Sequence, residues 1–140
     1  MIISNERLEK NYNIAFSIIE NVIGKDRVKE KIRNIEKVGI SPNAKRRHGV
    51  CKIRGNSCII EVSKHLFNFE DKEMITTLIH EILHTFKDTK GHGEMWQWYA
   101  NQITNNTEYK ITRTRIKLNI CLVLQTVFNN ITMLLQIFIK

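Results

Sequence analysis

Residues 71–87 have the sequence DKEMITTLIHEILHTFK. Apolar side chains recur in it at helical spacing, which predicts one long amphipathic helix, opened by two acids that suit the positive end of the helix dipole. At about 100° per residue, Thr77, His80 and His84 fall on the side opposite the apolar face. We therefore expect the helix to bury its apolar face in a core and to turn its histidines toward a cleft. The apolar face consists of Met74, Ile75, Leu78, Ile79, Ile82, Leu83 and Phe86.

The same helix contains His80-Glu81-Ile82-Leu83-His84, an HExxH motif. Residues four positions apart lie one helical turn apart, so the two imidazoles can take adjacent corners of a zinc tetrahedron. Glu81 lies between them and is displaced so that it reaches a water molecule rather than the ion. A carboxylate in that place can act as a general base while the water attacks a carbonyl.

A catalytic zinc ion needs a third protein ligand, and the sequence after the helix offers one. His92 is the first candidate, because Gly91 and Gly93 permit a tight turn that returns its imidazole over the helix. Glu94 and Glu108 are lesser candidates, since a thermolysin-like ligand set would use a downstream glutamate.

Other interpretations of the histidines are weaker. The metzincin pattern requires a glycine and a third histidine where this chain has Lys87 and Lys90, so that class is excluded. His48 and His65 have no partner at ligand spacing and are interpreted as ordinary residues.

Two helices are expected upstream. An apolar stripe that follows Ser4, a plausible N-cap, predicts a helix that Gly24 ends. A shorter helix is expected over residues 26–36.

Residues 50–62 carry the clearest β-hairpin signal, with Gly55-Asn56 as a two-residue turn. The alternation places both cysteines of the hairpin on its apolar face, where they are interpreted as small core residues rather than as ligands. The predicted register pairs Cys51 with Ile60 and Ile53 with Cys58.

After the histidine-bearing helix, a further helix is expected through residues 95–103. Trp96 falls on its apolar stripe and is expected in the core, whereas Trp98 lies off the stripe and is expected to line the cleft. Residues 109–116 alternate loosely, which favours an edge strand.

The composition is that of one soluble globular domain. The chain has 140 residues, 42% of them hydrophobic and 26% charged. Its three cysteines form no CxxC pair and no secretory signal opens the chain, so the reducing cytoplasm is the expected compartment. The abundance of Ile, Asn and Lys indicates an AT-rich bacterial or phage genome, and association with a nucleoid would suit the charge.

The net charge of +8 is unevenly distributed. Residues 37–60 and 109–140 contain cations and no acid, which favours non-specific electrostatic contact with nucleic acid and leaves a merely solvated surface as the alternative. The cations expected to touch phosphate are Lys45, Arg46, Arg47, Lys52, Arg54, Arg113, Arg115 and Lys117.

The motifs together resemble the SprT-like (Spartan-type) zinc metallopeptidase domain family. The HExxH motif is followed by Gly91-His92-Gly93, the place where the family has its GHG segment. Residues 44–51 (AKRRHGVC) are similar to the family's basic "RRLG" strand, and residues 59–66 (IIEVSKHL) to the strand that leads into its active-site helix. The resemblance covers roughly residues 8–117 and includes the order and spacing of the motifs.

The resemblance implies an α+β, zincin-like domain over residues 1–117, with a small antiparallel sheet packed on helices. It implies zinc on His80, His84 and His92, with Glu81 as the catalytic base. The expected function is that of a zinc endopeptidase that cleaves protein bound or crosslinked to DNA. Two alternatives remain: a non-catalytic, zinc-stabilised module that binds nucleic acid, and a degenerate protease that serves as an interaction subunit.

Residues 118–140 depart from the family, whose bacterial members commonly continue into a zinc ribbon with two cysteine pairs. This stretch has one cysteine and is uncharged up to its final lysine. It has a heptad-like apolar stripe that suits a helix docked on the domain or on a second copy, and a truncated or frame-shifted ribbon is the alternative. A membrane span is disfavoured, because its polar amides are costly in lipid. These amides are Asn119, Gln125, Asn129, Asn130 and Gln136.

Overall fold

The computed structural model of the protein describes residues 1–43, 47–114 and 131. Helix α1 (Glu6–Ile23) begins where the Asn5 side chain accepts a hydrogen bond from the Leu8 N–H at 3.1 Å. Asn5 is therefore the N-cap, and the expectation of Ser4 in that place is wrong. Gly24 ends the helix, as predicted, with a φ of 98° that suits glycine.

The next segment differs from the helix predicted over residues 26–36. A short helix, α2 (Lys25–Lys31), is followed by strand β2 (Asn34–Ser41). The register of β2 shifts just after Ile35, so that Ile35 and Val38 both pair with buried residues of the next strand although they lie three positions apart. This β-bulge gives the strand a helix-like apolar spacing, which is why periodicity predicts a helix there.

The predicted hairpin is present, with its predicted register. Strands β3 (Gly49–Arg54) and β4 (Ser57–Ser63) pair in the antiparallel sense. Both cysteines of the hairpin are free thiols, one buried and one half-buried. The expected pairs are found: Cys51 with Ile60 and Ile53 with Cys58.

The sheet has four strands in the order β1-β2-β4-β3, where β1 is Ile2–Ile3. β1 and β4 both run parallel to β2, and only the β3–β4 pair is antiparallel. The expectation of an antiparallel sheet is therefore wrong, because β1 and β2 were not predicted and both join in the parallel sense. β3 is left at one edge of the sheet.

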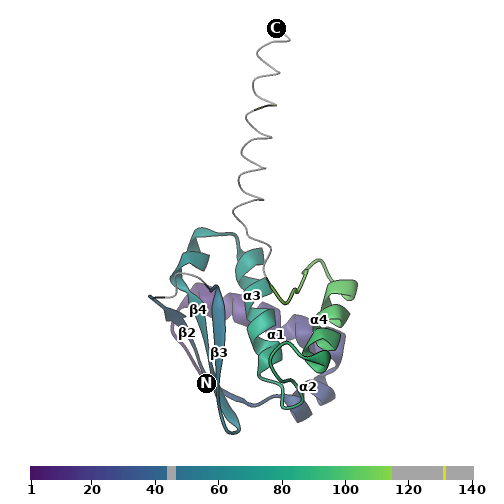
Figure 1. The fold of residues 1–140 in the computed structure, drawn as a ribbon. Coiled ribbons are helices and arrows are strands. Elements are labelled where there is room, and N and C mark those ends of the chain that lie inside the picture. The colour runs from purple at the N-terminus through teal and green to yellow at the C-terminus, as the bar shows by residue number, and fades with distance from the viewer. Residues whose placement is uncertain (44–46, 115–130, 132–140) are drawn as a thin grey trace.

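The helices gather on one face of the sheet (Figure 1). A short 3-10 helix (Lys64–Asn68) leads from β4 to α3 (Asp71–His84), and α4 (Glu94–Asn106) follows a loop. α3 occupies the middle of the molecule, because it packs against α1, α4, β3 and β4. The core lies between the sheet and these helices, and α3 contributes to it the apolar face that the sequence predicts.

One more expectation, an edge strand after α4, is not met. Residues 109–114 form no strand, although the sequence favours an edge strand over residues 109–116. The predicted boundary after Lys117 lies outside the described residues, as does the rest of the segment 118–140 apart from Ile131.

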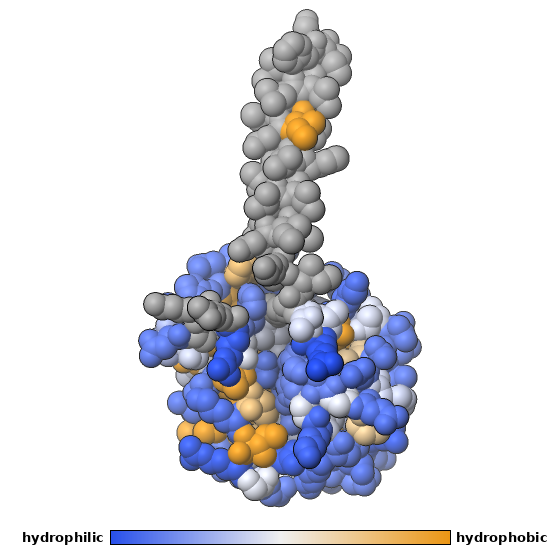
Figure 2. Space-filling model, in the orientation of Figure 1, coloured by the Kyte–Doolittle hydropathy of each residue, from blue (hydrophilic) through white to orange (hydrophobic). Residues whose placement is uncertain are grey.

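The surface is mostly hydrophilic in the view of Figure 2, and apolar residues gather over the side where the β3–β4 hairpin lies. Ile53, near the tip of that hairpin, is 46% exposed. Within residues 1–43 and 47–114, no helix combines the length and the hydropathy that a bilayer crossing needs.

Candidate metal centre

Arginine side chains hold α3 at both ends. Arg7, on α1, donates a hydrogen bond to Asp71 Oδ1 at 2.8 Å and two more to backbone carbonyls just before α3. Arg33 donates to the Phe86 carbonyl just after α3 at 2.9 Å. Such fork-like contacts with several oxygens fix position as well as contribute energy. The helix that carries the HExxH motif is therefore fixed against α1 at one end and against Arg33, the residue before β2, at the other.

The loop after α3 turns sharply enough to bring His92 back over the helix. The Thr89 hydroxyl lies within hydrogen-bond distance of two carbonyl oxygens near the end of α3, at 3.0 and 2.9 Å. Gly91 has a φ of 54°, and a Cβ atom on Gly93 would lie 2.9 Å from the Lys90 carbonyl oxygen. Gly91 permits the turn by its backbone conformation, and Gly93 permits it because it has no side chain.

The imidazoles of His80, His84 and His92 converge on one point. Their Nε2 atoms lie 3.3 Å apart for His80 and His84, 3.2 Å for His84 and His92, and 2.9 Å for His80 and His92. All three side chains are partly buried, and together they can hold a metal ion. They are the three histidines that the sequence singles out.

His80 is oriented by its other ring nitrogen. Its Nδ1 lies 3.1 Å from the carbonyl oxygen of Thr112. Since a carbonyl can only accept a hydrogen bond, Nδ1 carries the proton and the lone pair of the neutral ring is on Nε2. Thr112 belongs to the segment that follows α4, residues 107–114, which we call the return segment.

Burial sets the protonation state of the other two ligands. Burial, assisted by the neighbouring His92, lowers the pKa of His84 to about 4, although a hydrogen bond to the Gly91 backbone acts in the opposite direction. Burial also lowers the pKa of His92, and the positive charge of Arg113 adds to this. Both rings are therefore neutral near pH 7, which is the form that donates a lone pair to a metal.

The ring of Trp96 packs against the imidazoles of all three histidines. Its ring centroid lies 4.7 Å from that of His80, 5.4 Å from that of His84 and 4.6 Å from that of His92. Trp96 is 1% exposed, which agrees with the expected core position. Trp98, expected in the cleft, instead packs its ring against Arg27 of α2 at 5.2 Å, so that expectation is wrong.

The side chain of Glu81 packs against the edge strand β3. It is 6% exposed, and a Cβ atom built on Gly49 would lie 2.9 Å from both its Cγ and its Oε1. A Cβ at that place would also lie 3.0 Å from Cγ2 of Thr77. Sequence reasoning did not find this role for Gly49, although the residue falls within the strand motif on which the family resemblance partly rests.

The remaining metal-ligand candidates lie elsewhere. Glu94 is exposed at the start of α4, and Glu108 pairs with Lys72 at 3.4 Å. Among the described residues the only group of histidines, cysteines and acids close enough to hold a metal is the histidine trio, so His48 and His65 also lie outside such a group.

The cations that were expected to contact phosphate do not share one surface of the molecule. Lys52 and Arg54 alternate with core-facing residues of β3, so they project from the sheet face turned away from α3, and Lys52 pairs with Glu61 at 2.7 Å. Arg47 is exposed just before β3, and Arg113 lies close enough to His92 to influence it. The other four lie outside the described residues: Lys45, Arg46, Arg115 and Lys117.

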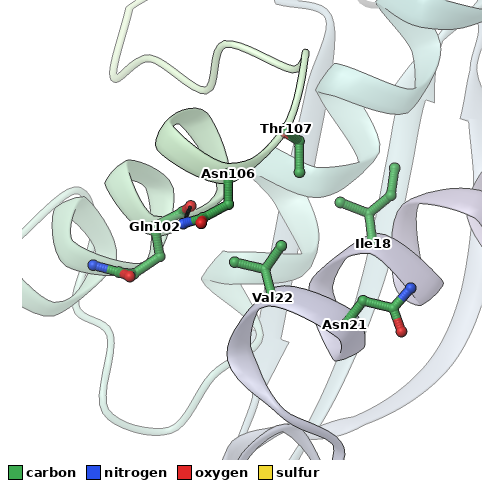
Figure 3. Close-up of a pocket in the computed structure, with 6 residues that line it drawn as sticks. All are labelled: Ile18, Asn21, Val22, Gln102, Asn106 and Thr107. Carbon is green, nitrogen blue, oxygen red and sulfur yellow. Dashed lines mark hydrogen bonds between the residues drawn. The ribbon is translucent and has the colours of Figure 1, made fainter.

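A separate pocket of about 500 Å³ lies between α1 and α4 (Figure 3). Its walls are amide, hydroxyl and aliphatic side chains, and it contains no acid, base or thiol. It therefore offers none of the chemistry of the metal centre. The lining residues are Ile18, Asn21, Val22, Gln102, Asn106 and Thr107.

The fold and the site together define an α+β protein with a three-histidine centre, in which two histidines lie on a central helix and the third on the loop that follows. A family model of the SprT-like family matches residues 20–115. That match spans more than half of the chain, so the protein belongs to the SprT-like family, as the motifs predict. No curated protein sequence matches the chain.

Proposed function

We propose that the protein is a zinc-dependent endopeptidase with a zincin-like active site. The observation that carries the proposal is the convergence of three Nε2 atoms at helix α3, which also carries Glu81 as a buried carboxylate. A buried acid next to a set of neutral imidazoles is the combination that metal-assisted hydrolysis of a carbonyl compound requires. Membership of the SprT-like family supports the same conclusion.

The ligand set fits zinc well. Nitrogens at about 2.1 Å from a tetrahedral zinc ion lie about 3.4 Å from one another. The three Nε2 atoms are separated by 2.9 to 3.3 Å, so small rotations of the rings suffice to reach that spacing. Three protein ligands leave one coordination position open, which is typical of catalytic rather than structural zinc.

Each residue of the centre has a distinct role in the proposed reaction. His80, His84 and His92 would hold the zinc ion, which when bound would supply Lewis-acid polarisation of the peptide carbonyl and a lowered pKa of the attacking water. Glu81 accepts a proton from that water at its carboxylate and later delivers it to the leaving amine nitrogen. Gly49 leaves the space in which the Glu81 carboxylate rests, and Trp96 excludes water from beneath the imidazoles.

The proposal is tested by Glu81→Gln in the full-length protein. The amide keeps the shape of the side chain and cannot accept the proton, so we expect metal content equal to that of the wild type and cleavage reduced by about 100-fold or more. Metal content is measured by elemental analysis and cleavage with an unstructured protein substrate. Glu94→Gln, which changes an exposed carboxylate near the ligands, should retain full activity. Equal cleavage by wild type and Glu81→Gln would contradict the proposal.

We further propose that the substrates are proteins bound to nucleic acid. The exposed cations Arg47 and Arg54 and the net charge of +8 support this partner, and Arg113 would bring positive charge close to the centre. Cleavage of a DNA-binding protein should then rise when DNA is added and fall as salt is raised. Salt-dependent DNA binding without any cleavage would instead favour a non-catalytic, metal-stabilised binding module.

A further inference from the structure

We infer that the return segment is a positioning element for the metal ligand His80, and that Thr104 is the side chain that holds it in place. This inference rests on the metal-binding part of the proposed function. It concerns how the chain prepares one ligand before metal arrives, through a contact between residues 32 positions apart in the sequence.

The contact itself is between a ring nitrogen and the main chain. Nδ1 of His80 lies 3.1 Å from the Thr112 carbonyl oxygen, and the geometry requires the proton to be on Nδ1. Partners of this kind fix both the tautomer and the rotation of a ligating imidazole. A carbonyl can do this only if the backbone that carries it is held still.

Thr104 of α4 supplies that restraint. Its hydroxyl accepts a hydrogen bond from the Ile111 N–H at 3.0 Å and lies 3.5 Å from the Ile111 carbonyl oxygen, to which it donates. One side chain thus engages both backbone groups of the residue directly before Thr112. The side chain of Ile111 is 5% exposed and belongs to the hydrophobic core, so the return segment is fixed by packing as well.

A second restraint acts at the start of the segment. The Thr107 hydroxyl accepts a hydrogen bond from the Tyr109 N–H at 3.1 Å and donates one to the Ile103 carbonyl of α4 at 2.7 Å. The chain therefore leaves α4 in a defined direction and meets Thr104 again through Ile111. The Thr112 carbonyl faces His80 as a result of these local contacts, and none of them involves the other two ligands.

The test compares metal binding by the wild type, Thr104→Val and Thr104→Ser, all as full-length protein. Valine keeps the shape and loses both hydrogen bonds, whereas serine keeps the hydroxyl. We expect Thr104→Val to bind zinc about tenfold more weakly, in competition with a chromophoric chelator, and Thr104→Ser to recover most of the affinity. The visible absorption bands of the cobalt-loaded protein should shift in Thr104→Val alone, because the geometry of one ligand has changed.

Asn5→Ala is the control for lost stability. It removes the N-cap of α1, a helix that carries none of the three histidines, and should lower the midpoint of unfolding while leaving zinc affinity and the cobalt spectrum unchanged. Zinc affinity in Thr104→Val equal to that of the wild type, or lowered equally in Asn5→Ala, would overturn the inference.

A measurement on the wild type keeps the inference testable should Thr104→Val fold poorly. In the nitrogen-15 NMR spectrum of the zinc-loaded protein, the His80 Nδ1–H should be visible and protected from exchange with solvent. An unprotected His80 Nδ1–H would overturn the inference. Failure of the wild type to bind metal at all would contradict the proposed function instead, so the two failures are distinguishable.

Discussion

Gly49 is important because of the atoms that face it. Its φ is not positive, so an alanine could adopt the same backbone conformation. The constraint is that Glu81 and Thr77 already occupy the space that a Cβ atom would need. The edge strand β3 therefore approaches helix α3 more closely than any residue with a side chain would permit.

We predict that Gly49→Ala impairs cleavage and preserves metal binding. The added methyl group must displace the Glu81 side chain, and a shift of about 1 Å in a catalytic group can cost about 100-fold in rate. We expect kcat/KM to fall by about 10- to 100-fold, with zinc content unchanged, as measured by a peptidase assay and elemental analysis. Gly39→Ala is the matched control, because its Cβ would meet the flexible end of Lys37 at 3.2 Å and would lie at ordinary contact distance, 4.0 Å, from the Ser4 hydroxyl. Unimpaired cleavage by Gly49→Ala would show that cleavage does not depend on the present position of the Glu81 side chain.

Some residues of the centre could be chosen from the sequence, and others could not. His80, His84 and His92 lie close together in the chain, so helical spacing and a glycine-flanked turn suffice to select them. The Thr112 carbonyl has no side-chain signal, because every residue carries a carbonyl. Trp96 and Trp98 were distinguished correctly as to burial, but periodicity does not show that the buried one lies beneath the histidines.

Helix α3 is held in position by charged side chains that a sequence pattern assigns to the surface. Arg7 and Arg33 are charged residues in polar stretches, yet each makes several hydrogen bonds that hold one end of α3. The helices α1, α3 and α4 and the hairpin followed from periodicity and turn chemistry. Strand β2 did not, because its bulge gives Ile35 and Val38 the spacing of a helix face.

The N-terminal anchor of α3 should depend on pH. Hydrogen bonds from Asn11 and Arg7 lower the pKa of the Asp71 carboxyl. A carboxyl with a lowered pKa stabilises the fold above its unfolded pKa of about 3.9, and this contribution is lost as the pH falls through the lower folded value. We predict that Asp71→Asn reduces the free energy of unfolding by about 0.5–1 kcal/mol at pH 7, because the pair is partly exposed.

The difference between wild type and Asp71→Asn should then shrink as the pH falls from about 4 through the lowered pKa of the folded carboxyl, because protonation removes the charge that the amide also lacks. Urea denaturation at several pH values measures it. Glu108→Gln removes the carboxylate of an exposed pair and should have little effect at any pH. A difference between wild type and Asp71→Asn that stays constant down to pH 2.5 would contradict the assignment.

For the whole molecule, the histidine trio brings together α3, the loop that follows it and α4, in addition to the direct packing of α3 against α4. Two of the histidines belong to α3, the third belongs to the loop before α4, and the Trp96 ring of α4 packs against all three. A ligand that binds only the folded state stabilises it in proportion to the logarithm of its concentration. Metal should therefore stabilise the packing of α3 against α4.

We predict that zinc at one hundred times its dissociation constant raises the midpoint of thermal unfolding by about 10 °C. A chelator should reverse the shift, which is measured by circular dichroism or calorimetry. His92→Ala should lose most of the shift, whereas His65→Ala, which alters an exposed histidine outside the centre, should retain it. A shift of equal size in His92→Ala would show that the metal binds elsewhere.

The return segment also has a consequence for the order in which the protein is made. All three imidazoles have been synthesised once the ribosome reaches His92, whereas the carbonyl that orients His80 belongs to Thr112, which is added later. The contact between Thr112 and His80 can therefore form only after all three histidines have been added to the chain. Thr112 is thus the last part of this histidine environment to be added, and a chain that stopped before it would have all three histidines without the carbonyl that orients His80.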